Sequence, residues 1–102
     1  MSDHVALRGA EDVGKGGLAA FETSEGRIAV ANVGGRLYAF DDTCTHKGCS
    51  LSEGDLDGTV VTCPCHGGEF DVTTGEVLGG PPPEPVRTYR VRSLDDSVEV
   101  EI

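Results

Sequence analysis

Two short loops hold all four cysteines of the chain and two of its three histidines. Residues 44–49 read CTHKGC, and residues 63–68 read CPCHGG. Four cysteines in a chain without secretory features are more often metal ligands than a disulfide framework. Thiolates combined with imidazoles suit zinc or iron–sulfur chemistry. The two loops are therefore predicted to form one metal centre.

Each loop contains one cysteine closely followed by a histidine, and one further cysteine. The pairs are Cys44 with His46 and Cys63 with His66, and the further cysteines are Cys49 and Cys65. A structural zinc site is disfavoured, because zinc modules usually begin with two cysteines separated by about two to four residues. Thiol redox chemistry is disfavoured, because it usually relies on Cys-x-x-Cys within a βαβ unit. A [2Fe–2S] cluster with two thiolates on one iron and two imidazoles on the other uses both pairs.

The segments around the loops read as short β-strands joined by tight turns, at intervals of about ten residues. Strands are expected at residues 5–8, 18–22, 27–33, 36–40, 59–62, 69–72, 76–78, 86–92 and 98–102. Gly34-Gly35 and Thr73-Thr74-Gly75 are predicted hairpin turns, because glycine readily adopts the positive φ that such turns need. Fifteen glycines and five prolines disfavour helices, and no helix is expected. The fold class is therefore all-β.

Length and charge exclude several functions. The 102 residues suffice for one small domain, residues 1–102. The formal charge of −10 disfavours binding to nucleic acid or to an anionic membrane surface, since both depend on basic patches. The sequence has no apolar run of about 18 residues and no signal peptide at its polar start. We therefore expect a cytoplasmic protein without a membrane segment.

The spacing of cysteine and histidine resembles the Rieske signature, in which C-x-H is followed by C-x-x-H about fifteen to seventeen residues later. The resemblance covers most of the chain. It includes Gly34-Gly35, Leu51, Gly54, Phe70-Asp71, Thr74-Gly75 and the proline-rich stretch. It implies antiparallel sheets in a small sandwich or barrel-like fold with a cluster-binding subdomain. That subdomain would consist of loops 41–53 and 63–71, covered by the proline-rich loop 79–85, which is not expected to pair in a sheet.

The resemblance implies one [2Fe–2S] cluster, with Cys44 and Cys63 on the inner iron and His46 and His66 on the outer iron. Replacing two anionic thiolates by neutral imidazoles lowers the negative charge at the cluster. The reduced form is then less costly, and potentials rise to about −150 to +300 mV, from about −400 mV in plant-type centres.

Cys49 and Cys65 match positions that form a disulfide in the high-potential Rieske proteins of cytochrome bc complexes. The resemblance therefore implies a Cys49–Cys65 disulfide that clamps the two loops. The alternative is two thiols, since a reducing cytosol disfavours exposed disulfides.

Four residues are expected beside the cluster without binding iron: Gly68, Phe70, Pro81 and Pro82. Respiratory Rieske proteins usually carry hydroxyl side chains at the first two of these positions, and those hydroxyls donate hydrogen bonds to sulfur. Neither Gly68 nor Phe70 has such a donor. A potential at the low end of the Rieske range is therefore expected.

Charged residues near the loops are candidates for partner docking. Lys47 is expected at the tip, either against a partner or simply solvated. Acidic residues flank both loops and would orient the domain toward a basic surface, or merely keep the chain in solution. They are Asp41, Asp42, Glu53, Asp55, Asp57, Glu69 and Asp71.

The resemblance implies a monomeric electron carrier, not an enzyme. It would pass single electrons from a flavin-dependent reductase to a terminal ring-hydroxylating oxygenase. The chain has no flavin or nicotinamide motif and no mononuclear iron site of its own. The alternatives are the small Rieske subunit of an assimilatory nitrite reductase and, as a different class, a structural zinc module. The nitrite reductase subunits often deviate at the ligand positions, all four of which this chain retains.

Overall fold

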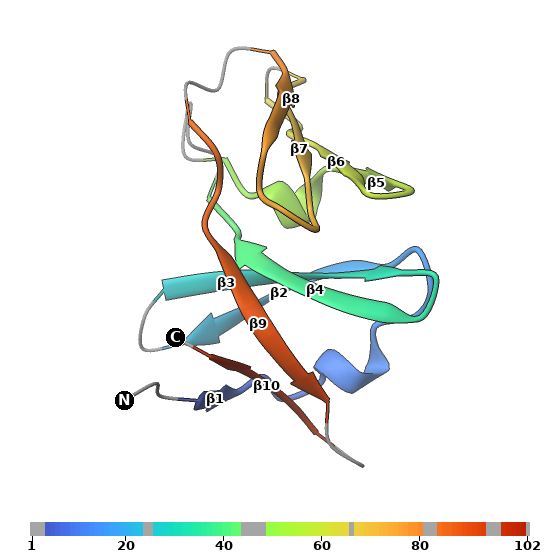
Figure 1. The fold of residues 1–102 in the computed structure, drawn as a ribbon, viewed down its shortest axis with the longest axis vertical. Helices are drawn as coiled ribbons and strands as arrows, with labels where there is room; N and C mark the ends of the chain where they lie inside the picture. Colours follow the sequence, from blue (N-terminus) through green and yellow to red (C-terminus); the bar gives the residue numbers. More distant parts are fainter. Residues whose placement is uncertain are drawn as a thin grey trace.

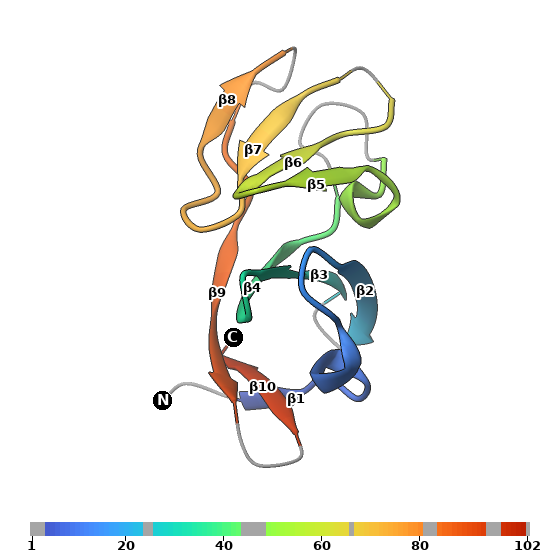
Figure 2. The ribbon, with the colours of Figure 1, turned by 90° about the vertical axis from the view of Figure 1, so that its right-hand side faces the viewer.

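Ten strands form two antiparallel sheets in the computed structural model, which describes residues 4–23, 26–43, 49–65, 67–80, 84–93 and 97–101. The larger sheet has the order β1 (His4–Ala6), β10 (Val98–Glu101), β9 (Thr88–Ser93), β4 (Arg36–Asp41), β3 (Gly26–Val33), β2 (Leu18–Thr23). The smaller sheet has the order β5 (Asp55–Asp57), β6 (Val60–Thr62), β7 (Glu69–Asp71), β8 (Val77–Gly79). The larger sheet curls into a barrel-like body, and the smaller sheet lies at one end of it (Figures 1 and 2). The predicted all-β class is confirmed.

The β3–β4 hairpin is the turn predicted at Gly34-Gly35. These glycines have φ values of 62° and 102°, and the pairing begins at once with Val33 opposite Arg36. Glycine adopts this left-handed region without the steric cost that a Cβ would add. The hairpin fixes the direction of β4, which runs from this turn toward the first cysteine loop.

The apolar run of β3 is buried on both faces of the strand. Ile28 and Val30 pack into the core inside the curled sheet, whereas Ala29 and Ala31 pack into a second core. That second core also contains Phe70 of the smaller sheet. A strand covered on both sides reads as a continuous apolar run. β3 is thus the layer on which the smaller sheet rests.

In the sequence, the smaller sheet lies between β4 and β9, and these two flanking strands pair with each other. Ala39 and Phe40 of β4 pair with Tyr89 and Thr88 of β9. The Asp41 N–H extends this contact by donating to the Arg87 carbonyl at 2.9 Å. The chain therefore leaves and re-enters the larger sheet at one place, which positions the smaller sheet over its end.

The smaller sheet corrects two predictions. β5 was not expected, since Asp55 and Asp57 are poor strand formers, yet it pairs with β6. Gly79 was assigned to a loop outside any sheet, but it pairs with Glu69 as the last residue of β8. The predicted turn at 73–75 is confirmed between β7 and β8. Its Asp71 carboxylate accepts hydrogen bonds from the Thr73 N–H at 2.8 Å and hydroxyl at 2.6 Å.

Two three-residue 3₁₀ turns, η1 (Ala10–Asp12) and η2 (Leu51–Glu53), depart from the expectation of no helix. Within the described part of the chain, no helix is long and apolar enough to cross a bilayer.

Candidate metal centre

The first cysteine loop is closed at its base by backbone pairing. Thr43 and Ser50 form an antiparallel bridge, and the Leu51 N–H donates to the Asp42 carbonyl at 2.6 Å. The chain therefore leaves and returns at one point. Residues 44–48 lie outside the described residues, and with them the predicted ligands Cys44 and His46 and the candidate docking residue Lys47.

The second cysteine loop is a tight turn that starts at Cys63. The Cys63 N–H donates to the Gly68 carbonyl at 2.7 Å, and the Gly67 N–H donates to the Cys63 carbonyl at 3.1 Å. Gly67 has a φ of 71°, which allows the chain to reverse direction. His66 lies outside the described residues.

A disulfide between Cys49 and Cys65 joins the two loops, with their Cα atoms 6.4 Å apart. The Cys63 sulfur lies beside this bond, and the three Sγ atoms are all within 4.8 Å of one another. Cys65 is exposed, Cys49 is half-buried, and Cys63 is 3% exposed. The pairing implied by the resemblance is therefore present in the structure.

Apolar side chains form the floor beneath Cys63. Leu51, Val61 and Phe70 are fully buried and belong to the same core as Cys63, and Cys49 packs against that core. Phe70 was predicted to lie beside the metal centre, and it shares this core with Cys63. The Cys63 sulfur is thus shielded from water on its inner side.

The segment after β8 touches the second loop through two glycines. A Cβ on Gly80 would lie 2.7 Å from the Gly68 Cα, and Gly80 has a φ of 88°. Gly68 is itself buried. The proline-rich segment therefore starts against the second loop, while Pro81 and Pro82 lie outside the described residues.

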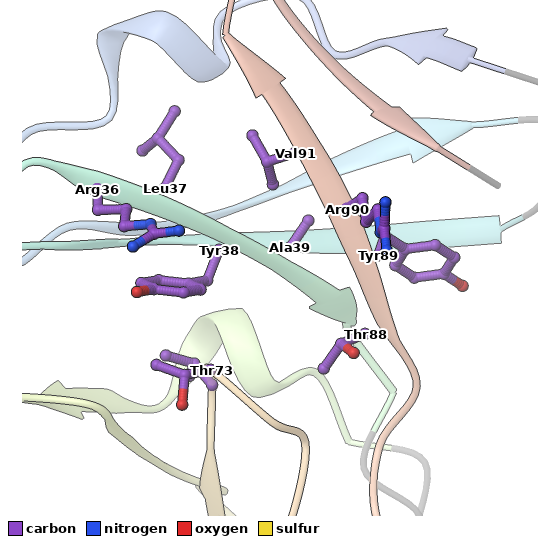
Figure 3. A pocket seen from close by; sticks show the side chains of 10 residues that line it. Arg36, Leu37, Tyr38, Ala39, Thr73, Thr88, Tyr89, Arg90 and Val91 are labelled. Atoms are coloured by element: carbon purple, nitrogen blue, oxygen red, sulfur yellow. The ribbon is translucent and has the colours of Figure 1, made fainter.

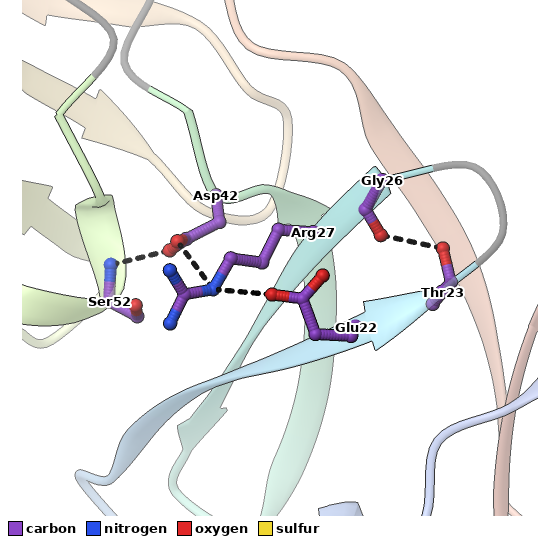
Figure 4. Close-up of polar contacts among 6 residues, drawn as sticks. All are labelled: Glu22, Thr23, Gly26, Arg27, Asp42 and Ser52. Atoms are coloured by element: carbon purple, nitrogen blue, oxygen red, sulfur yellow. Dashed lines mark hydrogen bonds and ion pairs between the residues drawn. The ribbon is translucent and has the colours of Figure 1, made fainter.

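Asp42 is a buried carboxylate rather than a docking group, which corrects one prediction. It is 1% exposed and accepts a hydrogen bond from the Ser52 N–H at 2.7 Å (Figure 4). The Arg27 Nε lies 3.7 Å from it and 3.5 Å from Glu22 (Figure 4). Asp42 therefore holds the exit of the first loop against the larger sheet. Sequence reasoning missed this role, because an aspartate beside a polar loop carries no signal of burial.

Two more of the flanking acids have structural roles. The Asp41 carboxylate accepts a hydrogen bond from the Tyr89 hydroxyl, which locks β4 to β9. The hydroxyl and the N–H of Thr73 stabilise the charged form of Asp71, and they lower the pKa of this carboxyl. The acids that remain exposed are Glu53, Asp55, Asp57 and Glu69.

A cavity of about 540 Å³ opens between β4 and β9 (Figure 3). Leu37, Ala39 and Val91 contribute apolar surface to it, and Arg36 and Arg90 add positive charge from the two strands. Among its lining residues there is no cysteine or histidine. The cavity is therefore separate from the sulfur-containing loops.

The donor chemistry of the loops fits an iron–sulfur centre. A thiol lies on an apolar floor in a turn fixed by backbone hydrogen bonds, and soft thiolate ligands favour iron–sulfur clusters over hard cations. Of the four predicted ligands, Cys63 is the one that the structure describes.

The model of the Rieske [2Fe-2S] domain family matches residues 3–90. The chain therefore belongs to the Rieske [2Fe–2S] family. Its cofactor is one Rieske cluster, and it is an electron-transfer protein rather than an enzyme.

Within this family the chain is similar to ferredoxin components of dioxygenase systems. Ferredoxin CarAc of Metapseudomonas resinovorans is 47% identical over 73 residues, which are 72% of this chain and 68% of that protein. A solved complex of reduced oxygenase and oxidized ferredoxin in carbazole 1,9a-dioxygenase contains a chain with 38% identity and a TM-score of 0.88. That match covers 95% of this chain and 91% of the other.

A putative NADH-dependent nitrite reductase small subunit from Mycobacterium tuberculosis has a TM-score of 0.85. The match covers 100% of this chain and 96% of the other, but only 17% of the residues are identical. This likeness therefore shows the fold alone.

Proposed function

We propose that the chain is the ferredoxin component of a ring-hydroxylating oxygenase system. It accepts one electron from a flavin-dependent reductase and donates it to the terminal oxygenase. The observation that carries this proposal is the similarity to dioxygenase ferredoxins, one of them in a complex with its oxygenase. We further propose that residues 1–102 act as one domain and as a monomer in the cytoplasm.

Cys44 and Cys63 are proposed as the thiolate ligands, and His46 and His66 as the imidazole ligands. When bound, the cluster supplies a reversible one-electron redox site. The residues of this chain hold the ligand-bearing loops rigidly. Backbone hydrogen bonds close both loops, and the Cys49–Cys65 disulfide joins them. Donors held in place in this way change little between oxidation states, which favours rapid electron exchange.

The polarity around Cys63 favours a low potential within the Rieske range. Phe70 is fully buried in the core that contains Cys63, and Gly68 forms the hydrogen-bonded end of the same turn. Neither side chain donates a hydrogen bond that would stabilise extra negative charge on sulfur. This agrees with a carrier that delivers electrons to an oxygenase.

The face around the cysteine loops is proposed as the docking surface. Glu53, Asp55, Asp57 and Glu69 are exposed on the smaller sheet and its approach, and Leu78 is 49% exposed on the edge strand β8. The acids would orient the domain toward a basic partner surface, and Leu78 would supply apolar contact. Lys47 is proposed to touch the partner from the loop tip.

A single-turnover experiment tests the proposal. The reduced chain is mixed with the oxidised terminal oxygenase of a carbazole 1,9a-dioxygenase system, and absorbance reports transfer of the electron. We expect rapid transfer with a rate that falls as salt is raised, since exposed charges are screened. No transfer to the oxygenase, with transfer to a nitrite reductase flavoprotein instead, would assign the chain to the alternative role.

A further inference from the structure

Three sulfur atoms lie together at the candidate metal centre, and only that of Cys63 is a proposed iron ligand. The Sγ atoms of Cys49, Cys63 and Cys65 lie within 4.8 Å of one another, and a disulfide joins Cys49 to Cys65. We propose that Cys63, when it holds no iron, attacks this disulfide and transfers it. The product is a Cys49–Cys63 disulfide, with a thiol on Cys65.

The transfer balances without any other reactant. The Cys63 sulfur forms a bond to the Cys49 sulfur while the bond between Cys49 and Cys65 breaks. The Cys65 sulfur keeps the electron pair of the broken bond and takes up the proton that Cys63 gave up. One disulfide and one thiol are present before and after the exchange, so neither an oxidant nor a reductant is consumed.

Burial and chain geometry select Cys49 as the sulfur that is attacked. Attack there expels Cys65, which is exposed, so the released thiol reaches water. Attack on Cys65 would instead join two residues separated by Pro64 alone, whose ring fixes φ. It would also expel Cys49, which is half-buried against the core. The Cys49–Cys63 product avoids both costs.

The two disulfides constrain the chain to nearly the same degree. The observed bond spans 65 − 49 = 16 residues, and the exchanged bond would span 63 − 49 = 14. The contribution of loop closure to the equilibrium constant scales with the 1.5 power of loop length. It therefore changes the ratio of the two disulfide isomers only about 1.2-fold. Cys49 already packs against the apolar core that contains Cys63. The exchanged disulfide would therefore lie against the same core, and both isomers should be populated once iron is gone.

The exchange makes iron binding and the second disulfide mutually exclusive. With Cys63 bonded to Cys49, its sulfur is no longer available to iron, and the exposed Cys65 becomes reactive. Iron binding to Cys63 would in turn hold the disulfide on Cys49 and Cys65. This inference assumes the ligand role proposed for Cys63, but the bonds of the iron-free chain are mapped without reference to electron transfer.

Bond mapping in two matched iron-free variants tests the inference. Cys44→Ser removes one proposed ligand and keeps all three sulfurs, whereas the double variant Cys44→Ser, Cys63→Ser also removes the attacking thiol. Each variant is purified without reductant, blocked with N-ethylmaleimide and cleaved after glutamate, because Glu53 separates Cys49 from the other two cysteines. Fragmentation of the peptide at the Cys63–Pro64 bond then shows whether the maleimide is on Cys63 or on Cys65.

We expect maleimide on Cys65 and a Cys49–Cys63 bond in at least about one third of the Cys44→Ser chains, given the near-equal closure terms. The double variant Cys44→Ser, Cys63→Ser should keep the Cys49–Cys65 bond and leave Cys65 unlabelled. If a variant does not fold, the disulfide bonds are mapped instead in the wild-type protein, before and after a chelator removes the iron anaerobically. An unshifted Cys49–Cys65 bond in every iron-free sample would overturn the inference. Labelling of Cys65 in the double variant would overturn it too, because no other cysteine thiol remains and reduction, not exchange, would then release Cys65.

Discussion

Gly80 lies so close to Gly68 that a Cβ added to Gly80 would be 2.7 Å from the Gly68 Cα. This contact joins the start of the proline-rich segment to the end of the second cysteine loop. The Gly80 backbone can approach Gly68 this closely because Gly80 carries no side chain. The contact gives the glycine at position 80 a packing reason.

Gly80→Ala should loosen this junction and shorten the lifetime of the bound cluster several-fold. The substitution adds the clash with Gly68 to the cost of a positive φ, which is about 1–2 kcal/mol for a residue with a Cβ. Gly16→Ala is the matched control, with a φ of 79° and no atom within 4 Å of the added Cβ. Decay of the visible absorbance in the presence of a chelator measures cluster loss. Equal decay rates in the two variants would contradict a role for the contact.

The Cys49–Cys65 disulfide should account for a large share of the stability of the domain. Closing a loop of this size is worth about 3 kcal/mol. At about 4–8 °C per kcal/mol, the Cys49→Ser, Cys65→Ser double variant should melt roughly 12–24 °C lower than the wild type. Dithiothreitol should lower the Tm of the wild type similarly and leave the double variant unchanged. Two alkylatable thiols at Cys49 and Cys65 in the anaerobically purified holoprotein would refute the disulfide in solution.

The turns and most strands follow from short-range features of the sequence. Gly34-Gly35 forms the predicted hairpin, because two adjacent glycines supply the positive φ that the turn requires. The cysteine and histidine spacing is equally local and was sufficient to indicate the family. Short-range signals therefore gave both the fold class and the family.

Long-range pairing and burial could not be predicted in this way. Ala39 pairs with Tyr89, which follows 89 − 39 = 50 residues later, and neither segment contains a feature that predicts this pairing. Likewise, β5 forms although aspartates occupy both its ends, because β6 offers a partner edge. Asp42 was taken for a surface charge, and its burial depends on Ser52 and Arg27 arriving from other elements. These features depend on the assembled fold.

Asp42→Ala should lower the free energy of unfolding by about 1–3 kcal/mol, because it removes the buried carboxylate that accepts the hydrogen bond of the half-buried Ser52 N–H. Asp42→Asn should cost less, since the amide oxygen still accepts that hydrogen bond. Arg27→Ala serves as the control. Its side chain is half exposed and 3.7 Å from Asp42, so a change within about 0.5 kcal/mol is expected. Guanidinium unfolding curves measure all three, and an Asp42→Ala variant as stable as Arg27→Ala would contradict this role.

Adding hydroxyl donors should raise the midpoint potential. Phe70→Tyr and Gly68→Ser place a hydroxyl beside the turn of Cys63, where it stabilises the extra negative charge of the reduced state. We expect an upward shift on the order of tens of millivolts. Phe21→Tyr is the control, because Phe21 packs against the other core, which does not contain Cys63. Protein-film voltammetry measures the potentials. A wild-type value far above zero, or equal shifts in Phe70→Tyr and Phe21→Tyr, would contradict the proposed low-potential environment.

The most direct test of the mixed thiolate and imidazole ligation is the EPR spectrum of the reduced protein, measured together with its iron and acid-labile sulfide. The ligation by Cys44, Cys63, His46 and His66 predicts a rhombic signal with an average g value below about 2, and about two irons and two sulfides per chain. Replacement of both histidines by alanine should abolish the signal. A colourless protein without labile sulfide, or an unchanged signal in the double histidine variant, would contradict the ligation.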